Sequence, residues 1–345
     1  MISGGSIAYY VVVALLSIIL FTLCIFLVVI IICRKKSVES EDNLPVKLCA
    51  HAYPLADIDT ITDGFNHRRI IGKGRLGTVY AATTATGDHL IAVKRIHPRL
   101  ILSNAGFGFS SIIKSLSLAH HPNVVPIIGF SEAPGERIIV MEFMAMKSLD
   151  FHLQQSSNSA TFLDWTQRLK IAAGAARGIE YLHEGTAPSI VHGGVKPSNI
   201  LLDVNFSARV CDYGLSFLAP HEMRGLIGYV DGECLVEKGG VCKENDVYGF
   251  GVVLLELLSG RSGEIGMLVE WALPLIRDMR IVEILDPRIL VPSDMKPIVR
   301  LAKLASACVS NTRKNRPSIV QVATILNSLE MELSLDLNIS SSSSG

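Results

Sequence analysis

Twenty-seven consecutive residues near the start of the chain, Ile7–Cys33, contain no Asp, Glu, Lys, Arg or His. A helix of that length spans about 40 Å, more than the roughly 30 Å of a bilayer's hydrocarbon core. The segment therefore predicts a transmembrane helix. A cleaved signal peptide is the alternative, but its apolar region is usually about 7–15 residues long and its start is basic. Here residues 1–6 precede the run, and none of them is basic.

Three basic residues, Arg34, Lys35 and Lys36, follow the apolar run directly. The positive-inside rule then predicts that residues 1–6 lie outside the cell and that the rest of the chain lies in the cytosol, with the plasma membrane as the expected location. The lipid bilayer is thus one expected partner. Cys33, at the inner edge, is either a buried apolar residue or a site of palmitoylation.

Charge and cysteine content narrow the remaining classes of function. Lys and Arg number 32, and Asp and Glu also number 32. This balance gives no sign of a basic face, so nucleic acid is not an expected partner. The seven Cys show no C-x-x-C spacing and are odd in number, which indicates neither a disulfide framework nor a zinc site.

The rest of the chain divides by composition into three parts. Residues 34–64 are polar and are expected to form a juxtamembrane segment with a short helix near Pro54–Gly64. Residues 65–329 form one folded unit, whose length indicates two lobes. Residues 330–345 are expected to be a Ser-rich tail of low complexity.

The folded unit changes its periodicity after Leu149. Short β-rich runs bounded by turn residues precede that point, at Gly77–Ala82, Leu90–Ile96 and Arg137–Phe143. Apolar residues at helical spacing follow it, at Trp165–Glu184, Asp246–Ser259, Ile298–Ser310 and Ser318–Leu329. The predicted fold class is α+β, with a small β-rich lobe followed by a large helical lobe.

A glycine-rich run, Gly72–Val79, has the pattern G-x-G-x-x-G-x-V between two strand-like segments. Glycines let backbone N–H groups approach phosphate oxygens closely, although alone the pattern also suits a plain hairpin turn. Twenty residues after Gly74 comes Lys94, on a strand that would point its charge toward those phosphates. The two features together favour a phosphate site.

Two further blocks complete the pattern, His192-Gly193-Gly194-Val195-Lys196-Pro197-Ser198-Asn199 and Asp212-Tyr213-Gly214. In order and spacing, the four blocks resemble the protein-kinase signature set: the glycine loop, the strand Lys, the H-R-D-x-K-x-x-N loop and D-F-G. Three later segments resemble further kinase motifs: Gly228–Glu233, Asn245–Gly251 and Asn315–Ser318. Three others resemble the corresponding segments of plant receptor-like kinases: Leu163–Trp165, Ala172–His183 and Leu268–Ala272. The resemblance implies a two-lobed protein-kinase fold.

The resemblance also implies ATP and magnesium as cofactors. Asn199 and Asp212 would hold the metal, and Met141 would be the gatekeeper before the adenine-binding hinge. The full set expected to bind the nucleotide is Gly72, Lys73, Gly74, Gly77, Val79, Ala92, Lys94, Met141, Glu142, Met144 and Asn199.

Positions that maintain the kinase fold are expected to persist. By the same resemblance, Glu233 would pair with Arg316 and brace the large lobe, and Asp246 would bind the backbone of the His192 loop.

The catalytic Asp of the family is missing. Its position is Gly194, with Gly193 in place of the preceding Arg, while Lys196 is retained. Glycine can neither accept a proton nor orient a hydroxyl. Because a positioned acid or base contributes about 10²–10⁴-fold to a rate, phosphoryl transfer is expected to be absent or very slow.

Two other departures from the kinase pattern affect the positioning of the strand Lys and the switching of the activation segment. Ile112 occupies the place of the Glu that pairs with the strand Lys, and the sequence contains no acidic residue between Asp88 and Glu132. Leu226 replaces the Thr of the activation segment, in which Ser216 is the only remaining Ser or Thr from Asp212 to Glu233.

The function expected from the sequence is that of a membrane-anchored receptor-like pseudokinase. It would bind ATP and act as a signalling scaffold or allosteric partner of an active receptor kinase or other signalling proteins. The alternative is a weak or atypical Ser/Thr kinase, because another carboxylate could replace the missing Asp.

Overall fold

The computed structural model describes residues 49–342, apart from residues 85, 86, 88, 104–107, 155–161, 220–224, 234–240 and 265. The expected membrane helix over Ile7–Cys33 and the first part of the expected juxtamembrane segment therefore lie outside the described residues. Within the described ranges, no helix is both long enough and apolar enough to cross a bilayer.

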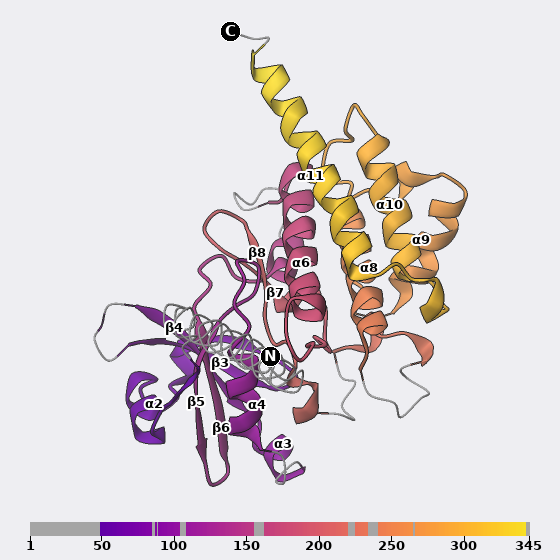
Figure 1. The fold of residues 1–345 in the computed structure, drawn as a ribbon. Coiled ribbons are helices and arrows are strands. Elements are labelled where there is room, and N and C mark those ends of the chain that lie inside the picture. The colour runs from indigo at the N-terminus through magenta and orange to yellow at the C-terminus, as the bar shows by residue number, and fades with distance from the viewer. Residues whose placement is uncertain are drawn as a thin grey trace, which may run out of the picture. The chain divides into compact units, whose positions relative to one another are not determined.

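The first lobe is built on a six-stranded sheet with the order β1-β5-β6-β4-β3-β2 (Figure 1). Neighbouring strands are antiparallel, except that β1 pairs with β5 in parallel. The strands are β1 (His51–Ala52), β2 (Ile70–Lys73), β3 (Gly77–Thr83), β4 (Leu90–Ile96), β5 (Ile127–Ala133) and β6 (Glu136–Glu142). The three runs expected as strands match β3, β4 and β6 to within one residue.

Helix α2 (Leu55–Ile61) belongs to this lobe, although the sequence placed it in the juxtamembrane segment. Its Ile58 is fully buried and shares an apolar cluster with residues of the sheet, among them Tyr80, Val93 and Val140. The sheet itself begins at His51. Residues 51–61 are therefore part of the folded unit, because their apolar side chains are needed to cover the sheet.

Two further helices of the first lobe follow β4. Helix α3 (Pro98–Ser103) and helix α4 (Phe109–Leu116) precede β5. The buried ring of Phe109 contacts Phe130 of β5 edge-to-face, with ring centroids 6.4 Å apart. This contact holds α4 against β5 of the sheet.

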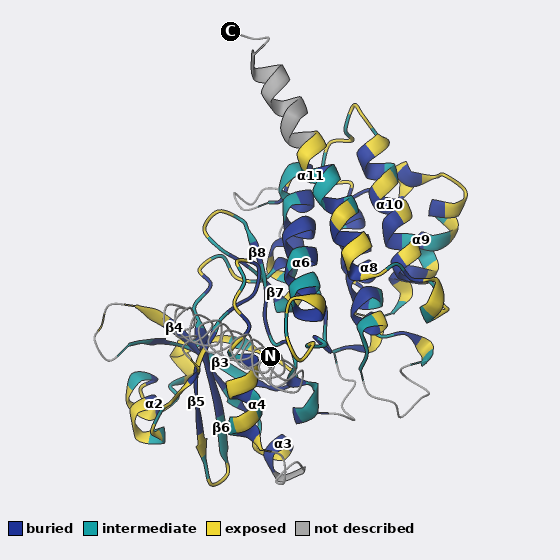
Figure 2. Ribbon diagram, in the orientation of Figure 1, coloured by how far each residue is buried: buried dark blue, intermediate teal, exposed yellow. Residues whose placement is uncertain are grey.

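The second lobe is helical (Figure 1). Its helices are α5 (Leu149–Leu153), α6 (Trp165–Glu184), α8 (Lys243–Ser259), α9 (Met267–Arg277), α10 (Lys296–Cys308) and α11 (Ile319–Ser342), and a short hairpin is formed by β7 (Ile200–Leu202) and β8 (Ala208–Val210). Buried residues concentrate on α6 and α8 (Figure 2). These two helices form the centre of the lobe, on which the loops of the site rest.

Helix α6 has the bounds expected from its apolar periodicity, because its start is marked by a capping box. Asp164 accepts from the backbone N–H of Gln167, whose side chain accepts from the backbone N–H of Asp164. Helix α8 begins three residues before the expected start. Helix α11 continues through Ser342, so much of the expected low-complexity tail is helical.

Candidate functional site

The glycine-rich run forms the turn between β2 and β3. Gly72 pairs with Val79 across the hairpin, and the Gly74 N–H donates to the Gly77 carbonyl over 2.9 Å. A Cβ on Gly77 would lie 2.1 Å from the Arg95 carbonyl oxygen, so no side chain fits there. A Cβ on Gly74 would meet nothing within 4 Å. One glycine is thus required by packing, while the space beside the other is open.

Lys94 and Asp212 are brought together although 118 residues separate them. Lys94 lies on β4 opposite Val79 of β3, and its Nζ forms a buried ion pair with Asp212 Oδ2. Burial opposes ionisation of Asp212, but the Lys94 ammonium outweighs it and holds the pKa of that carboxyl below its usual value. Asp212 also has a left-handed backbone, with φ of 63°. The ion pair and this conformation fix a carboxylate in front of the glycine hairpin.

The position expected for the Lys-pairing Glu carries an apolar side chain. Ile112 on α4 is partly buried and packs against the main hydrophobic core. Lys94 therefore takes its carboxylate partner from Asp212 in the second lobe rather than from α4.

The His192 loop is fixed by Asp246 of α8, as expected. Asp246 accepts from the backbone N–H groups of His192 and Gly193, over 2.7 and 2.8 Å. The His183 ring contacts the same carboxylate at 2.8 Å. Burial lowers the pKa of His192, which favours a neutral ring in this packed setting.

Asn199 is held beside the missing acid. Its Nδ2 donates to the Gly194 carbonyl over 2.8 Å, which leaves Oδ1 as the side-chain atom that can bind a cation. A Cβ on Gly194 would lie 3.6 Å from Asn199 Nδ2 and 3.8 Å from Leu226 Cδ2. The place of the proton acceptor is therefore open space beside an amide and an apolar side chain.

The expected hinge lies at the end of β6. Met141 and Glu142 close this strand, and Met141 pairs with Ala92 of β4. The Glu142 side chain accepts from Arg209 of β8 over 2.8 Å and so links the two lobes. Met144, two residues later, is buried.

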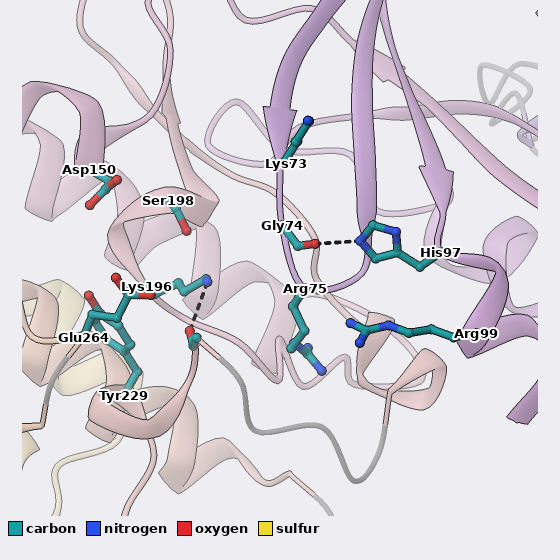
Figure 3. A pocket seen from close by; sticks show the side chains of 11 residues that line it. Lys73, Gly74, Arg75, His97, Arg99, Asp150, Lys196, Ser198, Tyr229 and Glu264 are labelled. Carbon is teal, nitrogen blue, oxygen red and sulfur yellow. Dashed lines mark hydrogen bonds between the residues drawn. The ribbon is translucent and has the colours of Figure 1, made fainter. Parts of the chain in front are cut away.

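A cavity of about 530 Å³ opens between the glycine hairpin and the activation segment. Figure 3 shows side chains of the first lobe on one side of it and side chains of the second lobe on the other. Lys196 belongs to the second-lobe side, and its Nζ donates to the Gly225 carbonyl over 3.0 Å. The lining residues are Lys73, Gly74, Arg75, His97, Arg99, Asp150, Lys196, Ser198, Gly225, Tyr229 and Glu264.

The expected pairing of Glu233 with Arg316 is wrong. Arg316 Nη1 binds Asp231 Oδ2 over 2.5 Å, and both side chains are almost fully buried. Glu233 instead lies 3.3 Å from Arg313, which also binds Asp231. Asp231 and Glu233 are two residues apart, and the buried Asp231 pairs with the buried guanidinium of Arg316.

Sequence reasoning named Lys73 and Lys196 but missed three other basic residues of the cavity, Arg75, His97 and Arg99. Arg75 donates to the Ala219 carbonyl of the activation segment over 3.1 Å. His97 and Arg99 lie just after β4, outside every recognised motif. Only their small separation from Lys94 along the chain could have pointed to them.

Comparison with known proteins agrees with this geometry. The protein kinase domain family matches residues 65–325. This chain belongs to the protein kinase family. Its kinase domain is the two-lobed fold described above.

The relatives of this kinase domain include plant receptor-like kinases. Leucine-rich repeat receptor protein kinase EMS1 of Arabidopsis thaliana is 35% identical over 308 residues, which cover 84% of this chain and 26% of that protein. Serine/threonine-protein kinase-like protein CCR2 of the same plant is 36% identical over 279 residues, covering 79% of this chain and 34% of that protein. The chain thus spans about a quarter to a third of these two relatives.

This chain covers a larger share of a shorter relative and of a solved structure. Probable serine/threonine-protein kinase PBL7 of Arabidopsis thaliana is 34% identical over 308 residues, or 84% of this chain and 80% of that protein. The pseudokinase domain of BIR2, described as an immune regulator of the RLK/Pelle family, has a TM-score of 0.71 and 32% identity, covering 83% of this chain and 91% of that one.

Proposed function

We propose that this protein is a membrane-anchored receptor-like pseudokinase, which binds ATP with magnesium and acts as a scaffold or allosteric partner of an active receptor kinase. The observation that carries this proposal is the setting of Gly194. Among the described residues, only Asn199 and Leu226 come within 4 Å of a Cβ built there, apart from chain neighbours. Neither an amide nitrogen nor an apolar side chain accepts a proton, so no carboxylate of the described residues contacts the position of the missing Asp.

Nucleotide binding is supported by the groups that remain. Asp212 and Asn199 offer the carboxylate and amide oxygens that magnesium prefers, and Lys94 lies beside them for the phosphates. When bound, magnesium would supply charge neutralisation at the phosphates. Breaking the Lys94–Asp212 pair to admit the metal weakens binding, so we expect a dissociation constant between about 1 μM and 1 mM.

Calorimetric titration with magnesium-ATP tests this part of the proposal. We expect saturable binding that Lys94→Glu abolishes, and a thermal shift that corresponds to about 2.7 kcal/mol at 100 times the dissociation constant. Lys114→Glu, a matched charge change on the exposed side of α4, should bind like the parent. If millimolar magnesium-ATP gives neither a calorimetric signal nor a thermal shift, the protein has no nucleotide site and would act as a scaffold only.

The membrane anchor is supported by the apolar run Ile7–Cys33 and by Arg34–Lys36 after it. Protease added to intact cells should leave a C-terminal tag untouched, because the kinase domain lies inside. Degradation of the tag in intact cells would contradict this orientation.

The alternative is a weak Ser/Thr protein kinase. It is favoured by the retained Lys94 and Lys196 and by the Asn199 amide, which is already oriented by its bond to Gly194. Positioning of ATP and substrate without a base would then supply the whole rate.

A further inference from the structure

The described part of the chain enters the first lobe beside the C-terminal end of α4. The exposed Cys49 thiol donates to the Lys114 carbonyl over 3.7 Å. The Ala50 N–H donates to Ser117 Oγ over 2.9 Å, so the chain is bonded to the end of this helix. Strand β1 follows at His51 and pairs with β5, against which α4 lies (Figure 1). The surface around this entry point is therefore the first part of the folded unit to follow the proposed membrane anchor.

Two apolar side chains flank the entry point and remain partly outside the core. Leu118, two residues after α4 ends, is 40% exposed. Ile128 is 41% exposed and lies at an irregularity of β5, next to Gly129, which pairs with His51 of β1. Single exposed apolar residues are common on soluble proteins, but a pair at the point where the chain leaves for a bilayer has the character of an interfacial contact.

The same surface offers a positive charge and no negative one. Lys114 is exposed, and among the described residues no carboxylate pairs with its ammonium. The residues that form the surface come from two stretches of the chain, 43–56 and 89–131, and neither stretch contains an Asp or Glu. Glu132, directly after the second stretch, is paired with Arg137 over 3.0 Å. An anionic surface can therefore approach without like-charge repulsion.

The length of chain before Cys49 keeps this surface close to the bilayer. Residues 34–48 separate the predicted membrane helix from Cys49. Even fully extended, a stretch of that length reaches at most about 50 Å. Because a tethered surface meets its target at a high effective concentration, contacts too weak for a free protein are sufficient to orient the lobe. The cytoplasmic leaflet is negative, which suits Lys114 and the basic residues Arg34–Lys36.

We propose that this surface of the first lobe rests on the anionic inner face of the membrane. Leu118 and Ile128 enter the apolar edge of the headgroup region, and the Lys114 ammonium binds anionic headgroups. The inference rests on the proposed membrane anchor, because two apolar residues and one Lys are too few to hold a free protein on a bilayer. Docking of this kind turns α4 and β1 toward the bilayer and leaves the other faces of the kinase domain to partner proteins. The exposed residues of the surface are Cys49, His51, Lys114, Leu118, His120 and Ile128.

Acylation of lysines in the full chain, reconstituted in lipid nanodiscs, tests the proposal. The discs contain either phosphatidylcholine alone or phosphatidylcholine mixed with phosphatidylserine, and an amine-reactive ester is followed residue by residue with mass spectrometry. We expect Lys114 to react at least about threefold more slowly in the anionic discs than in the neutral ones, with the difference lost at high salt. Lys303, an exposed lysine of α10, should differ less than about 1.5-fold between the discs.

A matched pair of double variants tests the apolar part of the contact. Leu118→Asp with Ile128→Asp should abolish the protection of Lys114, because the new carboxylates are repelled by the anionic lipid. Leu290→Asp with Val291→Asp changes two exposed apolar residues of the loop before α10 and should leave the protection as it is in the parent. All four positions are exposed, so both variants are expected to keep their fold.

Three results would overturn the inference: equal reactivity of Lys114 in the two kinds of disc, equal protection of Lys303, or protection that survives in Leu118→Asp with Ile128→Asp. Equal and slow reaction of Lys114 that speeds up as the discs are diluted would assign the surface to a second copy of the chain instead. Co-elution of the chain with the discs is measured on the same preparation and reports the anchor alone. A chain that co-elutes without protection of Lys114 removes only this inference, whereas a chain that does not co-elute removes the anchor of the proposed function and this inference with it.

Discussion

Position 194 can hold the side chain that phosphoryl transfer needs. Its backbone is not left-handed, and the nearest atoms to a Cβ there are at ordinary contact distances of 3.6 and 3.8 Å. Restoring the base alone still leaves Lys94 without a carboxylate on α4 and leaves Leu226 in place of a hydroxyl. Because groups that act as a unit are non-additive, we expect Gly194→Asp to stay within about tenfold of the parent rate.

The combined variant Gly194→Asp, Ile112→Glu, Leu226→Thr should gain at least about 10²-fold in radiolabel transfer from ATP. Gly232→Asp, an exposed glycine with open space around it, controls for the added charge and should gain nothing. An ordinary kinase rate from Gly194→Asp alone would mean that the other two losses have no effect on transfer.

Asp231 is the acid that braces the large lobe, and its removal should be costly. It is 2% exposed and binds both Arg316 and Arg313. Removing one partner of a buried ion pair leaves an uncompensated charge, so Asp231→Asn should cost about 3–5 kcal/mol of unfolding free energy. Glu233→Gln, in a half-exposed pair, should cost less than about 1 kcal/mol in denaturant titrations. A larger cost for Glu233→Gln than for Asp231→Asn would instead support the pairing of Glu233 with Arg316 that was expected from the sequence.

Glu256 gives the fold a pH dependence. Burial raises the pKa of this carboxyl from 4.5 to about 8, against the hydrogen bond that it accepts from Tyr229 over 2.6 Å. The folded state then holds a proton that the unfolded state releases, so the contribution to stability is present below pH 4.5 and is lost as the pH rises toward 8.

The pH profile of thermal unfolding checks this. Between pH 5 and about 8, the melting temperature of Glu256→Gln should fall less steeply than that of the parent, because the amide does not titrate. Glu270→Gln, on the exposed side of α9, should keep the parent's slope. Parallel profiles for the parent and Glu256→Gln would contradict the assignment.

At the scale of elements, α2 contributes to the stability of the first lobe. Its Ile58 is completely buried against the sheet, whereas Ile71 of β2 is 50% exposed. We expect Ile58→Ala to lower the unfolding free energy by about 2–5 kcal/mol through lost burial and an internal cavity. Ile71→Ala should cost less than about 1 kcal/mol in the same denaturant titration. Similar costs for both would mean that α2 does not support the sheet.

Local pattern was sufficient for the elements whose signals are contained in their own sequence. Helix α6 has a capping box and a long apolar stripe. Strands β3 and β4 are short β-rich runs bounded by turn residues. The bounds of all three elements were therefore predicted closely. The role of α2 was missed because its apolar residues Leu55, Ile58 and Ile61 alternate with Asp and Thr in a short stretch, and only the folded sheet shows what they cover.

Within the site, the motif residues were predictable because the chemistry of phosphate transfer fixes their types and spacing. The partner of Arg316 was not, since Asp231 and Glu233 are both acidic and only burial distinguishes them. Two basic residues that line the cavity, His97 and Arg99, were missed for another reason. His97 and Arg99 belong to no motif, and their convergence with Lys196 depends on how the two lobes meet.

At the scale of the whole molecule, the bonds that hold the kinase fold persist, while a glycine stands at the position of the family's proton acceptor. Asp246 still fixes the His192 loop, and Lys94 still meets Asp212 across the lobes. Gly194, in the His192 loop, has no side chain that could accept a proton. A molecule built in this way is expected to bind nucleotide and partners, and to signal through those contacts rather than through turnover.

Phosphate transfer from radiolabelled ATP to the purified cytosolic part tests this central claim most directly. The measurement compares the parent with Lys94→Glu, with magnesium and with manganese in turn. We expect no incorporation above the Lys94→Glu background with either metal, because no carboxylate of the described residues lies within 4 Å of a Cβ at position 194. Incorporation by the parent that disappears in Lys94→Glu would contradict the account and establish the chain as a weak kinase.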